Sequence, residues 1–172
     1  MSLNDYIIQR KRRKKFIAEI LIPYRGNRHP QAVSTQEFVR DPERGANCQT
    51  TTGGLLDRLG YTIIDPRSLE LAVDTTYTIA VPRLELVRSH DVVIFHPDDG
   101  RTDLRLGHTT VAHIEGRSIY LIHNSIEHGR TVQEKIIWEN QGRISAIKRP
   151  VRRNTEPDRP FLRAVGFEQL AA

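Results

Sequence analysis

The chain has 172 residues, of which 38% are hydrophobic and 27% are charged, as is typical of one folded domain with a single core. It holds one cysteine, which excludes an internal disulfide. The formal net charge of +5 favours polyanionic partners, and no apolar run approaches the roughly 20 residues that a membrane-spanning helix needs.

The first predicted element is a helix over residues 5–22, which ends before Pro23. Its charges occupy the place where a signal peptide needs an apolar stretch, so a cytoplasmic location is the default expectation. A basic run in this helix is expected to be its solvated face, the alternative being contact with nucleic acid or another polyanion. No helix-turn-helix, zinc-finger or RNA-binding pattern supports nucleic-acid binding. The run consists of Arg10, Lys11, Arg12, Arg13, Lys14 and Lys15.

Residues 23–47 lack hydrophobic periodicity and predict a long loop, which in a compact domain usually serves function. A second helix is expected over residues 48–60, with Leu55, Leu56 and Leu59 facing inward. Five short β-branched segments then predict strands over 77–81, 91–95, 109–114, 118–123 and 144–148. This order predicts an α+β domain with an antiparallel sheet over residues 1–148. Residues 149–172 form a Pro/Arg-rich C-terminal extension.

Cys48 stands where the predicted loop becomes the second helix. Unpaired N–H groups and the helix dipole at such a position stabilise a thiolate and lower its pKa. The same N–H groups can hold the oxyanion of a tetrahedral intermediate. A thiol nucleophile also needs a base within reach, and the base needs an orienting partner. The alternative is a buried structural thiol, which is common for a single cysteine.

Residues 107–125 supply both partners if Gly116 and Arg117 form a two-residue turn. The resulting pairs are Ile114 with Ile119, Ala112 with Leu121, Thr110 with His123 and His108 with Ser125. His108 and His123 then share one sheet face as diagonal neighbours, about 7–8 Å apart along the backbone. His113 falls on the opposite face, beside Tyr120, and is expected to be structural.

A histidine-rich metal site is the rival interpretation of this pair. The sequence has no HExxH, no CxxC and no carboxylate at ligand spacing beside the two histidines, which argues against zinc. We therefore expect neither a metal nor a cofactor. The remaining histidines are expected to be ordinary loop residues, and they are His29, His90, His96 and His128.

Four blocks of sequence resemble, in order, the NlpC-type cell-wall peptidases of the papain-like superfamily. They are AEILIPYRGN at 18–27, NCQTTTGGLLDRLGY at 47–61, DVVIFH at 91–96 and GHTTVAHIEGRSIYLIHNS at 107–125. The blocks are similar to the family's Pro-Tyr-Arg-Trp-Gly-Gly loop, Asp-Cys-Ser-Gly helix, Gly-Asp-Leu-Val-Phe-Phe strand, and Gly-His-Val-Gly-Ile-Tyr hairpin with its Ile-His-Ala-Ser strand. The resemblance spans residues 16–126 and implies a papain-like fold, with N-terminal helices packed on an antiparallel β-sheet.

The resemblance implies a cysteine peptidase or amidase that acts on peptidoglycan-type peptides without a cofactor. Cys48 corresponds to the nucleophile, His108 to the base and His123 to the residue that orients the base. Tyr24 corresponds to the family's loop tyrosine, which stands near the nucleophile. Asn47 and Gln49 fall at pocket positions around the nucleophile, where they are expected to contact the substrate or its oxyanion.

The chain departs from the family pattern at these pocket positions. Asn47 stands where the family has an acid, and this removes a carboxylate that would pair with the free amino end of a wall peptide. A phage, toxin-like or intracellular recycling role therefore fits as well as a housekeeping wall enzyme. Two further alternatives stay open, namely a related acyltransferase or deamidase, and a non-catalytic module that binds polyanions through its basic helix.

Overall fold

The computed structural model describes residues 45–62, 68–96, 107–125, 128–136 and 142–151, together with 156, 157, 160 and 162. The expected first helix over 5–22 lies outside the described residues, and so does most of the extension over 149–172. The same holds for Tyr24 and for the basic run of Arg10, Lys11, Arg12, Arg13, Lys14 and Lys15.

The described elements follow one another in the order α3 (Cys48–Arg58), α4 (Ser68–Val73), β1 (Thr78–Ala80), η2 (Leu84–Leu86), β2 (Val92–Phe95), β3 (His108–Glu115), β4 (Ser118–Ser125), β5 (Arg130–Lys135) and β6 (Ile144–Pro150). The strands form one sheet in the order β1-β6-β2-β3-β4-β5, and every pairing in it is antiparallel. The expected α+β architecture with an antiparallel sheet is confirmed. In the part of the chain that the structure describes, no helix is long and apolar enough to cross a membrane.

Helix α3 begins at the cysteine because the residue before it is a good N-cap. The Asn47 side-chain oxygen accepts a hydrogen bond from the Thr50 N–H at 2.8 Å, which satisfies one of the donors left open at a helix start. The helix ends at Arg58, and Gly60 follows with a φ of 83°, a left-handed conformation that glycine adopts without strain. The element expected over 48–60 is therefore present, two residues shorter.

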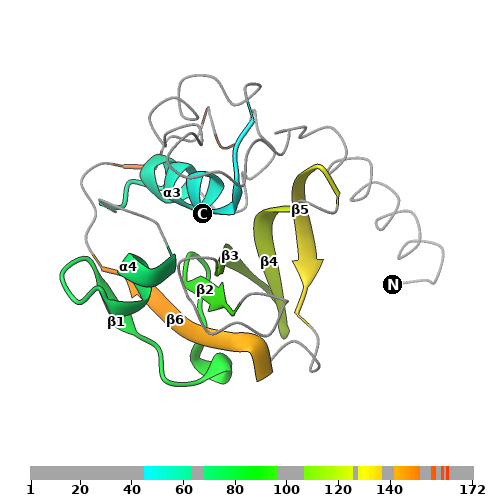
Figure 1. Cartoon of the computed structure of the whole chain (residues 1–172). Coiled ribbons are helices and arrows are strands. Elements are labelled where there is room, and N and C mark those ends of the chain that lie inside the picture. The colour runs from blue at the N-terminus through cyan, green and yellow to red at the C-terminus, as the bar shows by residue number, and fades with distance from the viewer. Residues whose placement is uncertain are drawn as a thin grey trace.

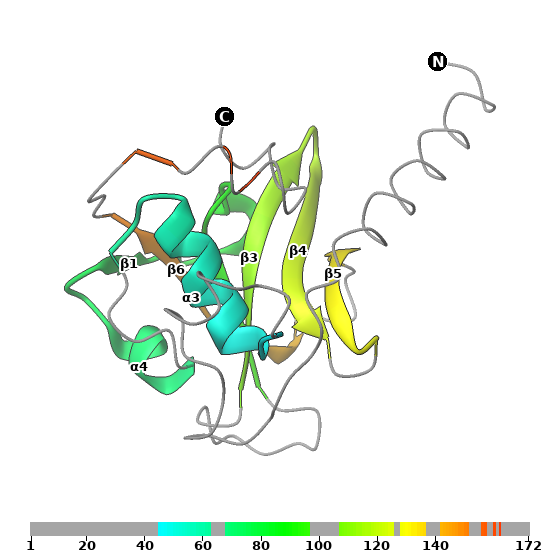
Figure 2. The same cartoon turned by 90° about the horizontal axis from the view of Figure 1, so that it is seen from above.

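The sheet carries a hydrophobic cluster on each face. On one face, buried leucines of α3 pack against alternate residues of the sheet, among them Val92, Ile94, Val111 and Ile122. Figures 1 and 2 show α3 lying across this face, with α4 beside β1 and β6. The residues between them, such as Val93 and Ala112, join a second cluster. Since strand side chains alternate between faces, β2 is buried along its whole length.

The β3–β4 hairpin has the register that the Gly116 turn predicts. Ile114 pairs with Ile119, Ala112 with Leu121 and His113 with Tyr120, and Gly116 has a φ of 59°. Both strands are longer than expected by one or two residues at their ends. Three short elements were not predicted from the sequence, namely α4, η2 and β5.

Candidate active site

Two histidine rings from neighbouring strands are in direct contact. His108 is the first residue of β3 and His123 lies near the end of β4. His108 Nε2 and His123 Nδ1 are 2.7 Å apart and form a hydrogen bond. The ring centroids are 4.5 Å apart and the rings are almost perpendicular, at 87°. The two side chains expected to share one face of the hairpin therefore touch.

Cys48, the first residue of α3, completes this arrangement. Cys48 is half-buried as a residue, and its thiol is hydrogen-bonded to the His108 side chain and to Thr109. Burial by itself raises the pKa of the Cys48 thiol. The hydrogen bond and charge of His108, with the bonds from Thr109, outweigh burial, so the pKa lies below its ordinary value. A lowered pKa increases the fraction of thiolate, which is the nucleophilic form.

His123 contacts Nε2 of the His108 ring. We infer that the other ring nitrogen, Nδ1, is the one that faces the sulfur of Cys48. The contacts thus run from the thiol of Cys48 to His108 and from His108 to His123. This is the order that a nucleophile, a general base and an orienting group require.

Buried threonines hold His108 beside the helix. Thr109 is fully buried in β3, and the hydroxyl of Thr52 in α3 donates to its hydroxyl at 3.2 Å. On the next residue, the Thr110 hydroxyl donates to the Val93 carbonyl of β2 at 3.1 Å. These bonds tie the start of β3 to both α3 and β2, so His108 and Cys48 are positioned by regular structure rather than by loops.

Asn47 and Gln49 have contacts within the protein that fix the start of α3. Asn47 caps the helix, as described above. The Gln49 amide donates to the Ser68 hydroxyl at 3.3 Å, and this hydroxyl donates to the Gly107 carbonyl at 2.8 Å. Gln49 therefore links α3, α4 and the residue before His108. The predicted contacts of Asn47 and Gln49 with substrate stay predictions, and Tyr24 lies outside the described residues.

The start of α3 has the donors that an oxyanion needs. The Thr50 N–H is taken by the Asn47 side chain, and the Thr51 N–H makes the first turn bond, to the Asn47 carbonyl at 2.9 Å. The N–H groups of Cys48 and Gln49 precede the first intrahelical hydrogen bond, so the helix itself offers them no acceptor. N–H groups at the start of a helix can stabilise negative charge that develops on a carbonyl oxygen.

Glu134 of β5 contacts His123 through the ring nitrogen that His108 does not use. Its Oε2 atom lies 3.5 Å from His123 Nε2, and the two side chains are 51% and 11% exposed. The hydrogen bond with His123 holds the pKa of Glu134 below its ordinary value. Burial lowers the pKa of His123, with the nearby His108 and His128 acting in the same direction and Glu134 against it. His123 therefore favours its neutral form.

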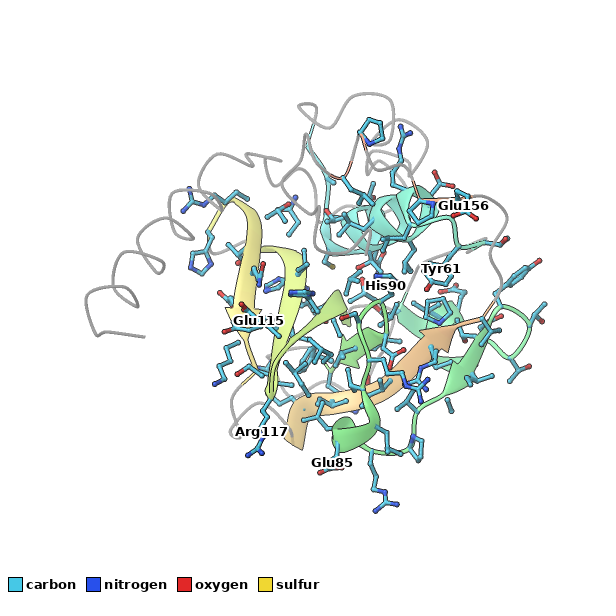
Figure 3. The ribbon with its side chains drawn as sticks, turned by 180° about the vertical axis from the view of Figure 1, so that it is seen from behind. Tyr61, Glu85, His90, Glu115, Arg117 and Glu156 are labelled. Carbon is cyan, nitrogen blue, oxygen red and sulfur yellow. The ribbon has the colours of Figure 1, made fainter. Side chains whose placement is uncertain are left out.

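Two histidines expected to be ordinary loop residues have specific partners. His128 Nδ1 lies 3.0 Å from the Ser125 hydroxyl and 3.8 Å from Glu134 Oε1, at the far end of the same chain of contacts. His90 Nδ1 is hydrogen-bonded to the Tyr61 hydroxyl at 3.0 Å, and Figure 3 shows these two side chains next to each other. His90 also has a positive φ, at 77°, and it is the one such non-glycine residue in the part of the chain that the structure describes.

Glu134 was missed by sequence reasoning because its strand was missed. The signal that could have found it is the turn at Gly129, which is followed by the β-branched pair Thr131 and Val132. Continuing the hairpin pattern from β4 puts Val132 opposite His123, and Glu134 then becomes a diagonal neighbour of His123. Among the described residues, no group of three or more His, Cys, Asp or Glu is arranged to hold a metal ion.

The chain was compared with protein-family models, with curated proteins and with solved structures, and none of the three comparisons finds a match.

Proposed function

We propose that this chain is a cysteine hydrolase, a peptidase or amidase in which Cys48 is the nucleophile, His108 the base and His123 the residue that orients the base. The observation that carries the proposal is the contact chain from Cys48 through His108 to His123, with the 2.7 Å bond between the two rings. It combines a thiol of lowered pKa with a base whose second nitrogen is held by another residue.

The reaction divides into two halves. In the first, the Cys48 thiolate attacks the carbonyl carbon of an amide, and the N–H groups of Cys48 and Gln49 stabilise the oxyanion. Protonated His108 then gives its proton to the leaving amine as the C–N bond breaks, which leaves a thioester on Cys48. In the second half, neutral His108 takes a proton from water, the hydroxide attacks the thioester, and the carboxylic acid is released, which restores the Cys48 thiolate and protonated His108.

The same geometry supports a papain-like fold of the NlpC type as our proposal for the fold family. A helix that starts at the proposed nucleophile packs on an antiparallel sheet, and the third strand after this helix, β3, begins with the proposed base. His90 precedes the DVVIFH block, at the position where the family motif has glycine. Its φ of 77° is a conformation that favours glycine, which supports the alignment of His90 with the glycine of the family motif.

The proposed substrate class is peptidoglycan-type peptides, and it rests on the four sequence blocks rather than on the site. The contacts of Cys48, His108 and His123 serve equally for an acyltransferase or a deamidase, because these enzymes share the thioester and differ in the group that resolves it or in the amide attacked. The polyanion-binding alternative depends on residues 10–15, which lie outside the described residues.

The test is hydrolysis of a panel of amides, namely muropeptides, their free stem peptides and glutamine-containing peptides, with and without added amine. We expect the wild type to cleave at least one member and Cys48→Ala to cleave none. Cys48→Ser is the matched control, because it keeps the size and hydrogen bonding of the thiol and loses its nucleophilicity at neutral pH.

Full activity in Cys48→Ala would contradict the proposal. A product that contains the added amine would identify acyl transfer, and release of ammonia from the glutamine peptides would identify deamidation. Circular dichroism of each variant would show that loss of activity does not come from loss of folding.

A further inference from the structure

Glu134 lies beyond the three residues to which the resemblance gives a role, and its carboxylate faces the far nitrogen of His123. We propose that Glu134 is a positioning residue that fixes the tautomer of His123 and, through it, the tautomer of His108, so that the nitrogen facing Cys48 is the unprotonated one. This inference deepens the proposed function and rests on it.

The first step of the argument concerns the bond between the two rings. The 2.7 Å distance from His108 Nε2 to His123 Nδ1 is compatible with either nitrogen as donor. If His123 donates, the proton of neutral His108 sits on Nδ1 and points at the sulfur, where it blocks proton transfer from the thiol. If His108 donates, its Nδ1 is bare and can accept the thiol proton. The distance between the two rings therefore does not decide which of these two proton arrangements is present.

The second step concerns Glu134, which determines which nitrogen of His123 carries the proton. An ionised carboxylate only accepts hydrogen bonds, so the His123 nitrogen that faces it is stabilised when it carries a proton. That nitrogen is Nε2, 3.5 Å from Glu134 Oε2. A neutral His123 with its proton on Nε2 has a bare Nδ1, which must accept from His108 Nε2. His108 then presents a bare Nδ1 to Cys48.

The third step concerns protonated His108, because the same arrangement of protons on His123 also suits this charged form. Once His108 has taken the thiol proton, both of its nitrogens carry protons, and Nε2 still needs an acceptor. The bare Nδ1 of His123 supplies one without any rearrangement. In the opposite order two N–H groups would face each other across 2.7 Å. Glu134 thus sets an arrangement that holds before and after proton transfer.

The position of Glu134 in the sheet keeps this contact in place. His123 pairs with Val132 and Leu121 pairs with Glu134 across β4 and β5, so Glu134 and His123 are diagonal neighbours on one face. The carboxylate is about half exposed, and water therefore keeps it ionised while screening part of its charge. Among the described residues, the titratable groups that act on it are His123, His128 and, more weakly, His108.

The direct test is the tautomer of His123, read from long-range ¹H–¹⁵N spectra of protein labelled on histidine at pH 8. The Cys48→Ser background is used because no thiolate can form there, so His108 stays neutral. We expect the Nε2–H tautomer of His123 when Glu134 is present. We expect it also in Glu134→Gln, whose amide oxygen still accepts, and a mixture of both tautomers in Glu134→Leu.

The second readout is the rate of alkylation of Cys48 by iodoacetamide at pH 7 in the chain that retains its cysteine. Glu134→Leu should slow it by about 2- to 5-fold, as expected for loss of a half-exposed charge, and Glu134→Gln by less. Glu85→Leu is the matched control, because Glu85 is an exposed carboxylate in η2, labelled in Figure 3. It should leave both readouts unchanged.

The proposal is overturned if His123 carries its proton on Nδ1 with Glu134 present, or if Glu134→Leu keeps the Nε2–H tautomer. A purely structural role predicts equal rates and equal tautomers in all three proteins. Because the tautomer is read in a chain without a thiol, it is independent of catalysis. An inert thiol combined with the expected tautomers would contradict the proposed function and leave the role of Glu134 standing.

Discussion

Two polar clusters on the same sheet differ in how their charges are arranged. Asp91, 1% exposed, accepts hydrogen bonds from Arg149 Nε at 2.9 Å, from Arg149 Nη2 at 2.7 Å and from the Arg88 N–H at 2.8 Å. The bond with Asp91 raises the pKa of Arg149. The other cluster brings together the thiol of Cys48 and the imidazoles of His108 and His123, which are side-chain types that ordinarily exchange protons nearer to neutral pH than carboxylates or guanidinium groups.

The difference separates a structural cluster from a reactive one. The bonds between the carboxylate and the guanidinium of the first are charge-assisted, and they join the residue before β2 to β6. In the second, the pKa values of Cys48 and His123 lie below their ordinary values, and Cys48 is a half-buried residue. Mutations should therefore separate stability from reactivity.

The largest effect is expected for His108→Ala. Loss of the base should lower turnover of any substrate found in the amide panel by about 10²- to 10⁴-fold. The free energy of unfolding should change by less than about 1 kcal/mol, because the ring is partly exposed and its partners are not permanently charged. Steady-state kinetics and urea unfolding measure the two quantities. Turnover near the wild-type value would remove His108 from the mechanism.

Asp91→Asn should give the opposite result. Leaving the Arg149 guanidinium without its carboxylate should lower the free energy of unfolding by about 3 kcal/mol, as for a broken buried ion pair. The rate of Cys48 alkylation below the unfolding transition should stay within about 2-fold of wild type. Glu85→Gln is the control for loss of an exposed carboxylate, and it should change neither the free energy of unfolding nor the rate of Cys48 alkylation. A large loss of Cys48 reactivity in Asp91→Asn would show that the two clusters are energetically coupled.

His123 variants should have an intermediate effect that depends on hydrogen bonding. His123→Leu removes the acceptor for His108 Nε2 and should slow turnover by about 10- to 100-fold, the size of a bond to a charged group. His123→Asn keeps an acceptor oxygen and should lose less. Equal losses in the two variants would show that His123 fills space rather than orients the base.

The register of the β3–β4 hairpin could be predicted from the sequence because it depends on residues that are close together in the chain. A glycine turn fixes the register, and a period of two then places His108 beside His123. The start of α3 was equally accessible, because Asn47 is a strong cap. The contact of Cys48 with His108 is tertiary and has no local signal, and it was expected only because a thiol nucleophile needs a base and because the sequence blocks resemble the NlpC-type family.

The missed elements depend on tertiary contacts instead. β5, with the sequence RTVQEK, is mostly polar, and at the sheet edge it is held by pairing with β4 rather than by its own hydrophobicity. α4 has six residues, too few to show helical periodicity. Glu134 could not be identified without β5, because neither its distance in sequence nor its charge points to His123.

The smallest effect is a pH dependence of stability. The folded pKa of His123 is lowered, so as pH falls below the unfolded value of about 6.5 the unfolded chain takes up a proton first and stability declines. The lowered pKa of Glu134 acts later, because its stabilisation is present above about pH 4.3 and is lost as pH falls through the folded pKa. Urea unfolding at pH 7.5 and 5.5 should show a smaller difference in His123→Asn than in wild type. An equal difference would assign the effect to other groups.

The central claim is that His108 activates Cys48, and the most direct measurement is the rate of Cys48 alkylation by iodoacetamide from pH 4 to 9 in wild type and in His108→Ala. The account predicts an apparent thiol pKa well below about 8.5 in the wild type, moving upward in the variant, where burial acts without the base. A thiol that is inert, or that titrates identically in both proteins, would contradict the account and leave Cys48 as a structural residue.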